Sequence, residues 1–298
     1  MSAIGLQQSG KRRRIVLRRS LESLKSAFTS NKTALAGAVM LAVIVLAAVG
    51  APFLSGIDPI DQDVMQRLRA PSAAHILGTD QFGRDTFARL LYGARVTLAI
   101  ALSANLGAMV IGTLVGLFAG YFGGRLDIVL MQSMDALLAL PALILGLLLV
   151  AVLGPNAVNI AVAITLTLIP AYARVARAPT IAIKQREYIA SGRALGYSDT
   201  RLMFGHILPN VTPEVLVVAS LWTASAVRVE ASLAFIGLGV RPPAATWGGM
   251  IRDGFENILD GPYLVIFPGL AILLLVFALN LMGDGLRDAI DPKLREEA

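Results

Sequence analysis

Four stretches of the chain carry no charged residue and are long enough to cross a membrane as helices. They cover residues 33–57, 96–124, 136–173 and 261–283. A helix needs about 20 residues to cross about 30 Å of hydrocarbon. The third stretch is nearly twice that length, and Gly154-Pro155-Asn156 supplies a turn that divides it in two. The pattern therefore predicts a polytopic membrane protein.

A sixth span is predicted over residues 213–235, where the apolar run is shorter. Residues 215–227 carry no charge, and Arg228 and Glu230 follow them. We expect the helix to begin at Pro213, because the missing N–H of proline costs little in a first turn. Arg228 and Glu230 then lie toward the far end of the span. They either reach the far interface or face a polar lumen, since charge inside a membrane is expensive and usually functional.

The distribution of positive charge orients these spans. With both ends of the chain in the cytoplasm, 18 Lys and Arg residues lie inside and seven lie outside, as the positive-inside rule requires. The predicted spans cover residues 33–54, 96–120, 128–152, 157–177, 213–235 and 263–283. The resulting parts are a basic cytoplasmic tail (1–32), a first span with an extracytoplasmic segment (33–95), a five-helix core (96–283) with a cytoplasmic loop (178–212), and a C-terminal cytoplasmic tail (284–298).

Composition supports the membrane assignment and excludes several function classes. The chain is 56% hydrophobic and 15% charged, whereas soluble domains carry about 25% charged residues. It has no cysteine and two histidines, so neither a metal site nor a catalytic residue is predicted. No phosphate-binding P-loop is present, which excludes ATP hydrolysis by that route. The basic residues gather before the first span, which favours anionic lipid over nucleic acid as their partner.

Two features of the spans concern packing. The second span has small residues at every fourth position, which lets helix backbones approach closely, either within the chain or between subunits. These residues are Ala104, Ala108, Gly112, Gly116 and Gly120. In the third span Pro141 predicts a kink near the middle of the membrane. Asp135 lies just before it and either pairs locally or lines a translocation path.

The sequence of the cytoplasmic loop predicts a helix, a turn and a second helix. Gly196 suits the left-handed residue that ends the first helix, and Ser198 or Asp199 is a candidate N-cap for the second. We expect the second helix to expose Leu202, Met203 and Phe204 before Pro209 ends it. Such a helix either offers an apolar knob to a groove on a partner or lies on lipid.

This loop resembles the EAA loop of ABC importer permeases, in the form typical of the dipeptide/oligopeptide branch. Ser191 and Gly192 stand where that branch has two alanines. The matching residues are Arg186, Glu187, Tyr188, Ile189, Arg193, Gly196, His206, Leu208, Pro209 and Asn210.

The likeness to C-type subunits of this branch extends over about residues 30–292. It includes the segment from His75 to Asp85, the run from Glu230 to Gly239, and Pro242-Pro243. Trp247-Gly248, Pro268-Gly269, the run Asn280–Asp288, and Asp291-Pro292 are similar to the same subunits. The basic tail before residue 30 lies outside the resemblance.

The resemblance implies an all-α fold of the type I ABC importer class with a cytoplasmic coupling helix. It implies a bacterial inner-membrane location, a B-type permease partner, two cytoplasmic ATPases that hold ATP and Mg, and an extracytoplasmic binding protein. No cofactor is expected on this chain. The residues expected to couple it to the ATPases are Glu187, Tyr188, Arg193, Gly196, Leu202, Met203, Phe204, His206 and Pro209.

Asp80, Arg84 and Asp85 have two interpretations in this setting. They form a structural charge cluster or a direct dock for the binding protein. Asp135, Pro141, Arg228 and Glu230 are candidates for the translocation path or a hinge. An ion-gradient-driven secondary transporter would need midplane ion ligands, and a membrane enzyme would need a nucleophile–base or metal constellation; the pattern favours neither. Dipeptides, oligopeptides, nickel chelates, glutathione, opines and sugars all remain open as cargo.

Overall fold

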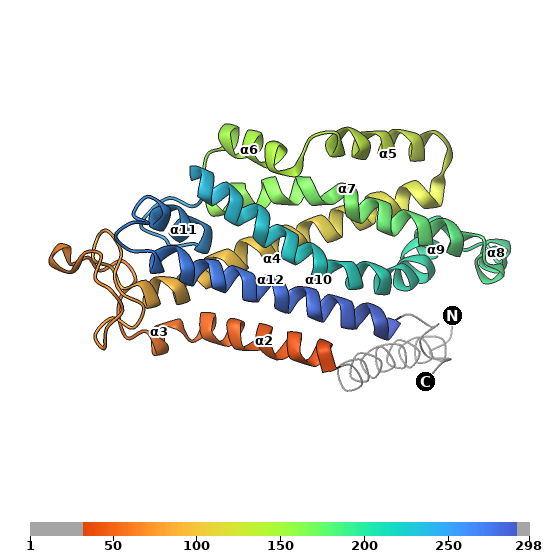
Figure 1. Cartoon of the computed structure of the whole chain (residues 1–298). Coiled ribbons are helices and arrows are strands. Elements are labelled where there is room, and N and C mark those ends of the chain that lie inside the picture. The colour runs from red at the N-terminus through yellow and green to blue at the C-terminus, as the bar shows by residue number, and fades with distance from the viewer. Residues whose placement is uncertain (1–31, 291–298) are drawn as a thin grey trace.

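The computed structural model describes residues 32–290, which form a bundle of long helices (Figure 1). In this part of the chain the β-type pairing is an isolated bridge between Thr79 and Asp85. Most of the predicted basic tail and the end of the C-terminal tail lie outside the described residues. The elements are α2 (Lys32–Val49), α3 (Ala51–Leu54), η1 (Val64–Gln66), α4 (Thr86–Phe122), α5 (Gly124–Leu138), α6 (Ala142–Leu153), α7 (Ala157–Lys184), α8 (Glu187–Ala194), α9 (Asp199–Leu202), η2 (Met203–Ile207), α10 (Leu208–Leu233), η3 (Ala234–Leu238), α11 (Trp247–Phe255) and α12 (Tyr263–Ile290).

The described residues hold six candidate spans. Five are single helical runs, and the sixth is the pair α5 and α6, which bend by 88° at a short break. The start of α2 and the end of α12 lie at the same end of the bundle as α8 and α9, while residues 55–85 and α11 lie at the opposite end (Figure 1). Both described ends of the chain therefore share a side with the predicted cytoplasmic loop, and the six-span architecture is confirmed.

Two predicted helix starts are wrong. α4 begins at Thr86 rather than at residue 96, because Asp85 caps it by accepting a 2.7 Å hydrogen bond from the Ala88 N–H. Arg89 does not interrupt this helix, since its guanidinium lies 3.3 Å from the Asp80 carboxylate. α10 begins at Leu208, so Pro213 lies inside the helix rather than in its first turn.

Pro209 does not end a helix, which corrects a third prediction. The chain runs as one helical rod from Asp199 to Leu238, broken only near its end by the left-handed Gly237. The turn before Pro209 is π-helical, and the Leu208 N–H bonds to the Met203 carbonyl five residues earlier. A π turn is wider than an α turn, and proline at the start of the following helix has no N–H to leave unpaired. The rod therefore passes through Pro209.

The small-residue stripe of α4 packs against α7 within the chain. A Cβ added at Gly112 would lie 2.6 Å from the Ile169 carbonyl oxygen, and one at Gly116 would lie 2.2 Å from that of Ala173. A Cβ added at Gly120 would lie 2.9 Å from Thr180 Cβ. Contacts this short exclude any side chain, so the stripe brings the two backbones together. Packing within the chain is the alternative that the structure confirms.

Candidate functional site

The cytoplasmic loop folds into a compact elbow, defined here as residues 186–207. α8 begins after Arg186 and carries Glu187 in its first turn, where a carboxylate suits the positive end of the helix dipole. Gly196 has φ +78°, the left-handed conformation predicted for it. The Ser198 hydroxyl accepts a hydrogen bond from the Arg201 N–H and caps α9, as expected.

Leu202 and Met203 are buried within the elbow, so the prediction that they form an exposed knob is wrong. Leu202 has no exposed surface, and it packs over Gly192, where an added Cβ would lie 3.1 Å from Leu202 Cδ2. Ile189 and Ile207 are buried beside them. These side chains hold α8 against the start of the long rod.

The exposed apolar surface of the elbow is formed by other residues. Leu195, at the C-cap of α8, is 74% exposed, and Tyr188 is 50% exposed. Phe204 is 41% exposed, so the prediction that it is exposed is confirmed in part. Its ring contacts the Phe118 ring of α4 edge to face. Sequence reasoning missed Leu195. The available signal was its place immediately before the left-handed Gly196, at the apex of the turn.

Aromatic and polar contacts fasten the elbow to the end of α4. The Tyr121 hydroxyl donates a 2.5 Å hydrogen bond to the Asp199 carboxylate. The Arg193 guanidinium lies 5.8 Å from the centroid of the same Tyr121 ring. Tyr197 stacks on His206 on one side of the elbow and carries Arg201 over its face. Because these contacts join the elbow to α4 and to the start of α10, a displacement of the elbow would be passed on to both helices.

A polar groove of about 470 Å³ lies between α5 and α7. Arg177 holds Asp127 with two hydrogen bonds of 2.6 and 2.5 Å, and Arg174 donates one of 2.6 Å to Asp135. Asp135 therefore pairs locally, as one of its two interpretations predicted. Asp135 and Arg174 are nevertheless more than half exposed, and charged side chains that face lipid are costly. This face of the bundle therefore faces water or another protein.

The break between α5 and α6 follows the end of the helix α5 that forms one side of the polar groove. Pro141 is exposed, has an extended backbone and sits at the N-cap of α6. The predicted kink is thus a sharp break, which follows from the missing N–H of proline. Irregular backbone at membrane depth is tolerated only where it is buried in protein or lines a water-filled cavity. The break and the polar groove therefore point to the same non-lipid surroundings.

Arg228 and Glu230 do not share one environment. Glu230 is fully buried, so the prediction that both side chains reach the far interface is wrong for it. Thr246 and Thr97 approach its carboxyl group, but among the described residues neither oxygen of Glu230 has a partner in hydrogen-bond geometry. Arg228 is exposed and donates a 2.7 Å hydrogen bond to Ser225.

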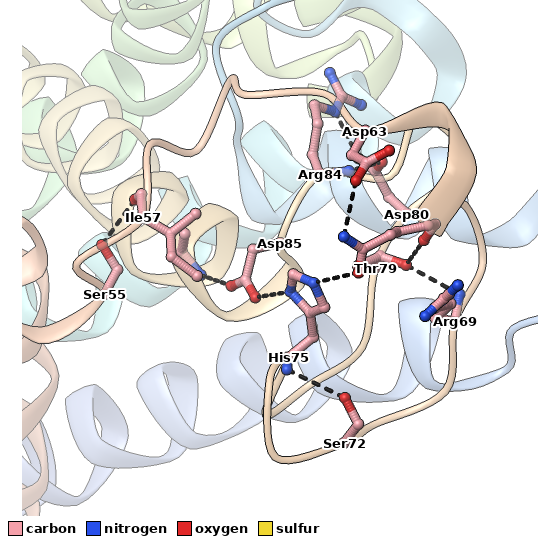
Figure 2. Close-up of polar contacts among 12 residues, drawn as sticks. Ser55, Ile57, Asp63, Arg69, Ser72, His75, Thr79, Asp80, Arg84 and Asp85 are labelled. Carbon is pink, nitrogen blue, oxygen red and sulfur yellow. Dashed lines mark hydrogen bonds and ion pairs between the residues drawn. The ribbon is translucent and has the colours of Figure 1, made fainter.

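Asp80, Arg84 and Asp85 form a buried charge cluster in the extracytoplasmic segment (Figure 2). Arg84 Nε lies 2.6 Å from Asp80, and the His75 ring bonds to Asp85 at 2.8 Å. Asp80, Arg84 and Asp85 are buried residues, at most 5% exposed, so they organise the segment from inside. This burial favours the structural interpretation of the cluster. Asp253 of α11 lies 3.9 Å from Arg84. Burial raises the pKa of the Asp253 carboxyl group, although the positive charges of Arg89 and Arg84 act to lower it.

Comparison with known proteins decides the family. The profile of the family described as "Binding-protein-dependent transport system inner membrane component" matches residues 112–296. The chain belongs to this family. The profile "N-terminal TM domain of oligopeptide transport permease C" matches residues 25–71 of the permease.

Relatives along nearly the whole permease carry consistent names. This chain is 42% identical over 284 residues to a di/tripeptide transport system permease protein, DppC, of Pseudomonas aeruginosa. The match covers 93% of this chain and 94% of the relative. The chain is 37% identical to the oligopeptide transport system permease protein OppC of Bacillus subtilis, covering 94% and 93%. The predicted likeness to C-type ABC importer permeases is confirmed, and the chain is a multi-pass transport subunit rather than a secondary transporter or an enzyme.

The fold agrees with this assignment. An inward-facing structure of the MetNI methionine ABC transporter superposes with a TM-score of 0.54 at 19% identity, covering 68% of the permease and 96% of that chain. At this identity the likeness concerns the fold alone. The type I importer fold predicted from the cytoplasmic loop is thereby confirmed.

Proposed function

We propose that this permease imports peptides, or a related small solute, delivered by an extracytoplasmic binding protein. A B-type permease would complete the membrane part, in the inner membrane of a bacterium. Two cytoplasmic ATPases would bind ATP and Mg and dock on the elbow, so that this chain itself performs no catalysis. The names of the relatives, which are dipeptide, oligopeptide and glutathione permeases, support peptides as cargo.

The elbow is the observation that carries this proposal. It presents Leu195 and Tyr188 outward, while its inner side is packed onto α4 and its last residues continue into α10. A short amphipathic helix of this kind suits a groove on a partner. ATP-dependent closure of the ATPases would move the elbow and reorient the rod, provided that the inward and outward states differ in their contacts.

The groove between α5 and α7 is the proposed wall of the translocation path. Its charged pairs and the exposed break at Pro141 require a non-lipid neighbour, and the B-type partner with a watery lumen between the subunits would provide one. Gln132 lines the groove. Because the chain has no cysteine, a single Gln132→Cys should react with a water-soluble thiol reagent in the assembled transporter. A residue shielded by lipid would not react.

Reconstitution tests the function as a whole. Uptake of peptide into vesicles should require ATP, the ATPases and the binding protein, and it should persist after an uncoupler collapses ion gradients. Uptake by this chain alone, or loss of uptake with the uncoupler, would contradict the proposal.

The coupling role of the elbow has a separate test at Gly196. An added Cβ there meets nothing within 4 Å, so only the φ of +78° opposes a side chain. Gly196→Val should abolish the ATPase stimulation by cargo-loaded binding protein while the chain still inserts in the membrane. Gly196→Asn is the matched control, because asparagine tolerates this conformation. Full uptake by the valine variant would refute the coupling assignment.

A further inference from the structure

An enclosed recess of about 190 Å³ lies at the extracytoplasmic end of the bundle, away from the elbow and the polar groove. Its walls come from the start of α4, the turn before α7, the π-helical turn η3, residues 239–246 and α11. We call it the outer recess. Its charged lining residues are Arg89, Arg241, Arg252 and Asp253.

The lining of the outer recess thus contains three arginines and one acid. Asp253 is shared, at 3.8 and 3.9 Å, between Arg89 and the buried Arg84 of the charge cluster. Arg241 is exposed and has no ion pair within 4 Å among the described residues. The outer recess therefore carries an excess of positive charge that its own residues leave uncompensated.

Arg89 forms the floor of the outer recess. Its side chain is 5% exposed, with Nε 3.3 Å from Asp80. Its Nη1 is buried and has no hydrogen-bond partner within residues 32–290. Asp80 already binds Arg84 at 2.6 Å. Arg84 and Arg89 share the two carboxylates of Asp80 and Asp253, and the Nη1 of Arg89 is left as a buried donor for a ligand.

Arg252 supplies the donors at the side. It is about half exposed, and its guanidinium crosses the π-helical turn at Gly237, where an added Cβ would lie 2.5 Å from Nη1. Gly237 has φ +99°, a left-handed conformation that favours glycine there. The partner of Arg252, Glu256, lies 3.5 Å from its Nε. Glu256 is the ion-pair partner of Arg252 within residues 32–290, which leaves the Nη donors of Arg252 for a ligand.

We propose that the outer recess binds a carboxylate, namely the carboxy-terminal group of the transported peptide as it enters the permease. The proposal rests on the proposed function and names the part of the cargo that is recognised. Arginine binds a carboxylate through a planar fork of two donors. The recess is smaller than the pockets of about 300–1,000 Å³ that enclose whole ligands, so it fits the end of a chain.

The electrostatic potential of the outer recess can be measured from the reaction rates of a cysteine placed in its lining. Ala244 is exposed in its lining, and the chain has no native cysteine. In the assembled transporter, Ala244→Cys should react faster with an anionic sulfonatoethyl methanethiosulfonate than with a cationic trimethylammonium analogue. Arg241→Gln with Arg252→Gln should lower this rate ratio about tenfold, the low end of electrostatic rate effects. Arg67→Gln, an exposed arginine outside the recess, should leave the ratio unchanged.

Protection by ligands identifies the source of the carboxylate. Alanyl-alanine should slow the reaction of Ala244→Cys, whereas alanyl-alanine amide should not, and the double arginine variant should lose the protection. Equal protection by both peptides, or by neither, would overturn the proposal. Protection by cargo-free binding protein that depends on both arginines would also overturn it, because the recess would then hold a carboxylate of that protein. None of these readouts needs ATP, so they are independent of the uptake experiment.

Discussion

Arg177 grips Asp127 with two hydrogen bonds, from Nε at 2.6 Å and from Nη2 at 2.5 Å. The pair ties α7 to α5 at the mouth of the polar groove, on the face that we propose lines the translocation path. Two parallel hydrogen bonds from one guanidinium define both the distance and the orientation of the two helices. The broken α5–α6 span is thus held in place by a specific polar contact at its cytoplasmic end.

Weakening the Arg177–Asp127 ion pair should destabilise the packing of α5 against α7. Asp127→Asn removes the charge and one acceptor oxygen, and because the pair is partly exposed we expect a loss of about 1 kcal/mol in stability. Thermal unfolding of the purified transporter would show it. Asp135→Asn, which affects the more exposed pair, should change the unfolding temperature less. A larger effect from Asp135→Asn would contradict the ranking.

The crossing of α4 and α7 should not tolerate a side chain at Gly116. Gly116→Val places methyl groups where the Ala173 carbonyl lies, and the backbones must separate, at a cost of about 3 kcal/mol. Gly269→Ala is the matched control, since this helical glycine has nothing within 4 Å of an added Cβ. The yield of folded, monodisperse protein should fall for the first variant alone, and equal yields would disprove the packing argument.

Leu195 should matter for ATPase docking and not for folding. Because it is 74% exposed, Leu195→Asp should leave the unfolding temperature unchanged. The same variant should weaken binding of the ATPases, measured by co-purification, and abolish stimulated ATP hydrolysis. Leu195→Met, which keeps an apolar side chain, should retain both. Normal coupling in the aspartate variant would place the docking surface elsewhere.

Asp85 should be needed for the start of α4. Its carboxylate accepts from the Ala88 N–H and contacts the His75 ring. Asp85→Ala should therefore destabilise the permease by about 2 kcal/mol, the upper range for an N-cap. Asp85→Asn keeps an acceptor oxygen for Ala88 and should cost less. Thermal unfolding compares the stability of the two variants. An identical loss of stability in both would show that the charge of Asp85, rather than its hydrogen bond to Ala88, stabilises the start of α4.

Local patterns were sufficient for the spans and for the turn chemistry of the elbow. An uncharged run of membrane length has to become a helix, because only a helix satisfies its backbone within the segment. The left-handed Gly196 and the Ser198 cap depend on neighbours a few residues away, and the smooth face of α4 through Gly116 follows from small residues at every fourth position. Each of these was therefore predictable from spacing alone.

Tertiary structure decided the features that depend on distant segments. Leu202 is buried because α8 folds back over it at Gly192, and Arg89 in the first turn of α4 pairs with Asp80 and with Asp253 of the distant α11. The depth at which Glu230 is buried and the 88° break between α5 and α6 follow from how helices pack. A hydrophobic pattern states that a side chain avoids water, whereas only the packed chain determines which surface covers it.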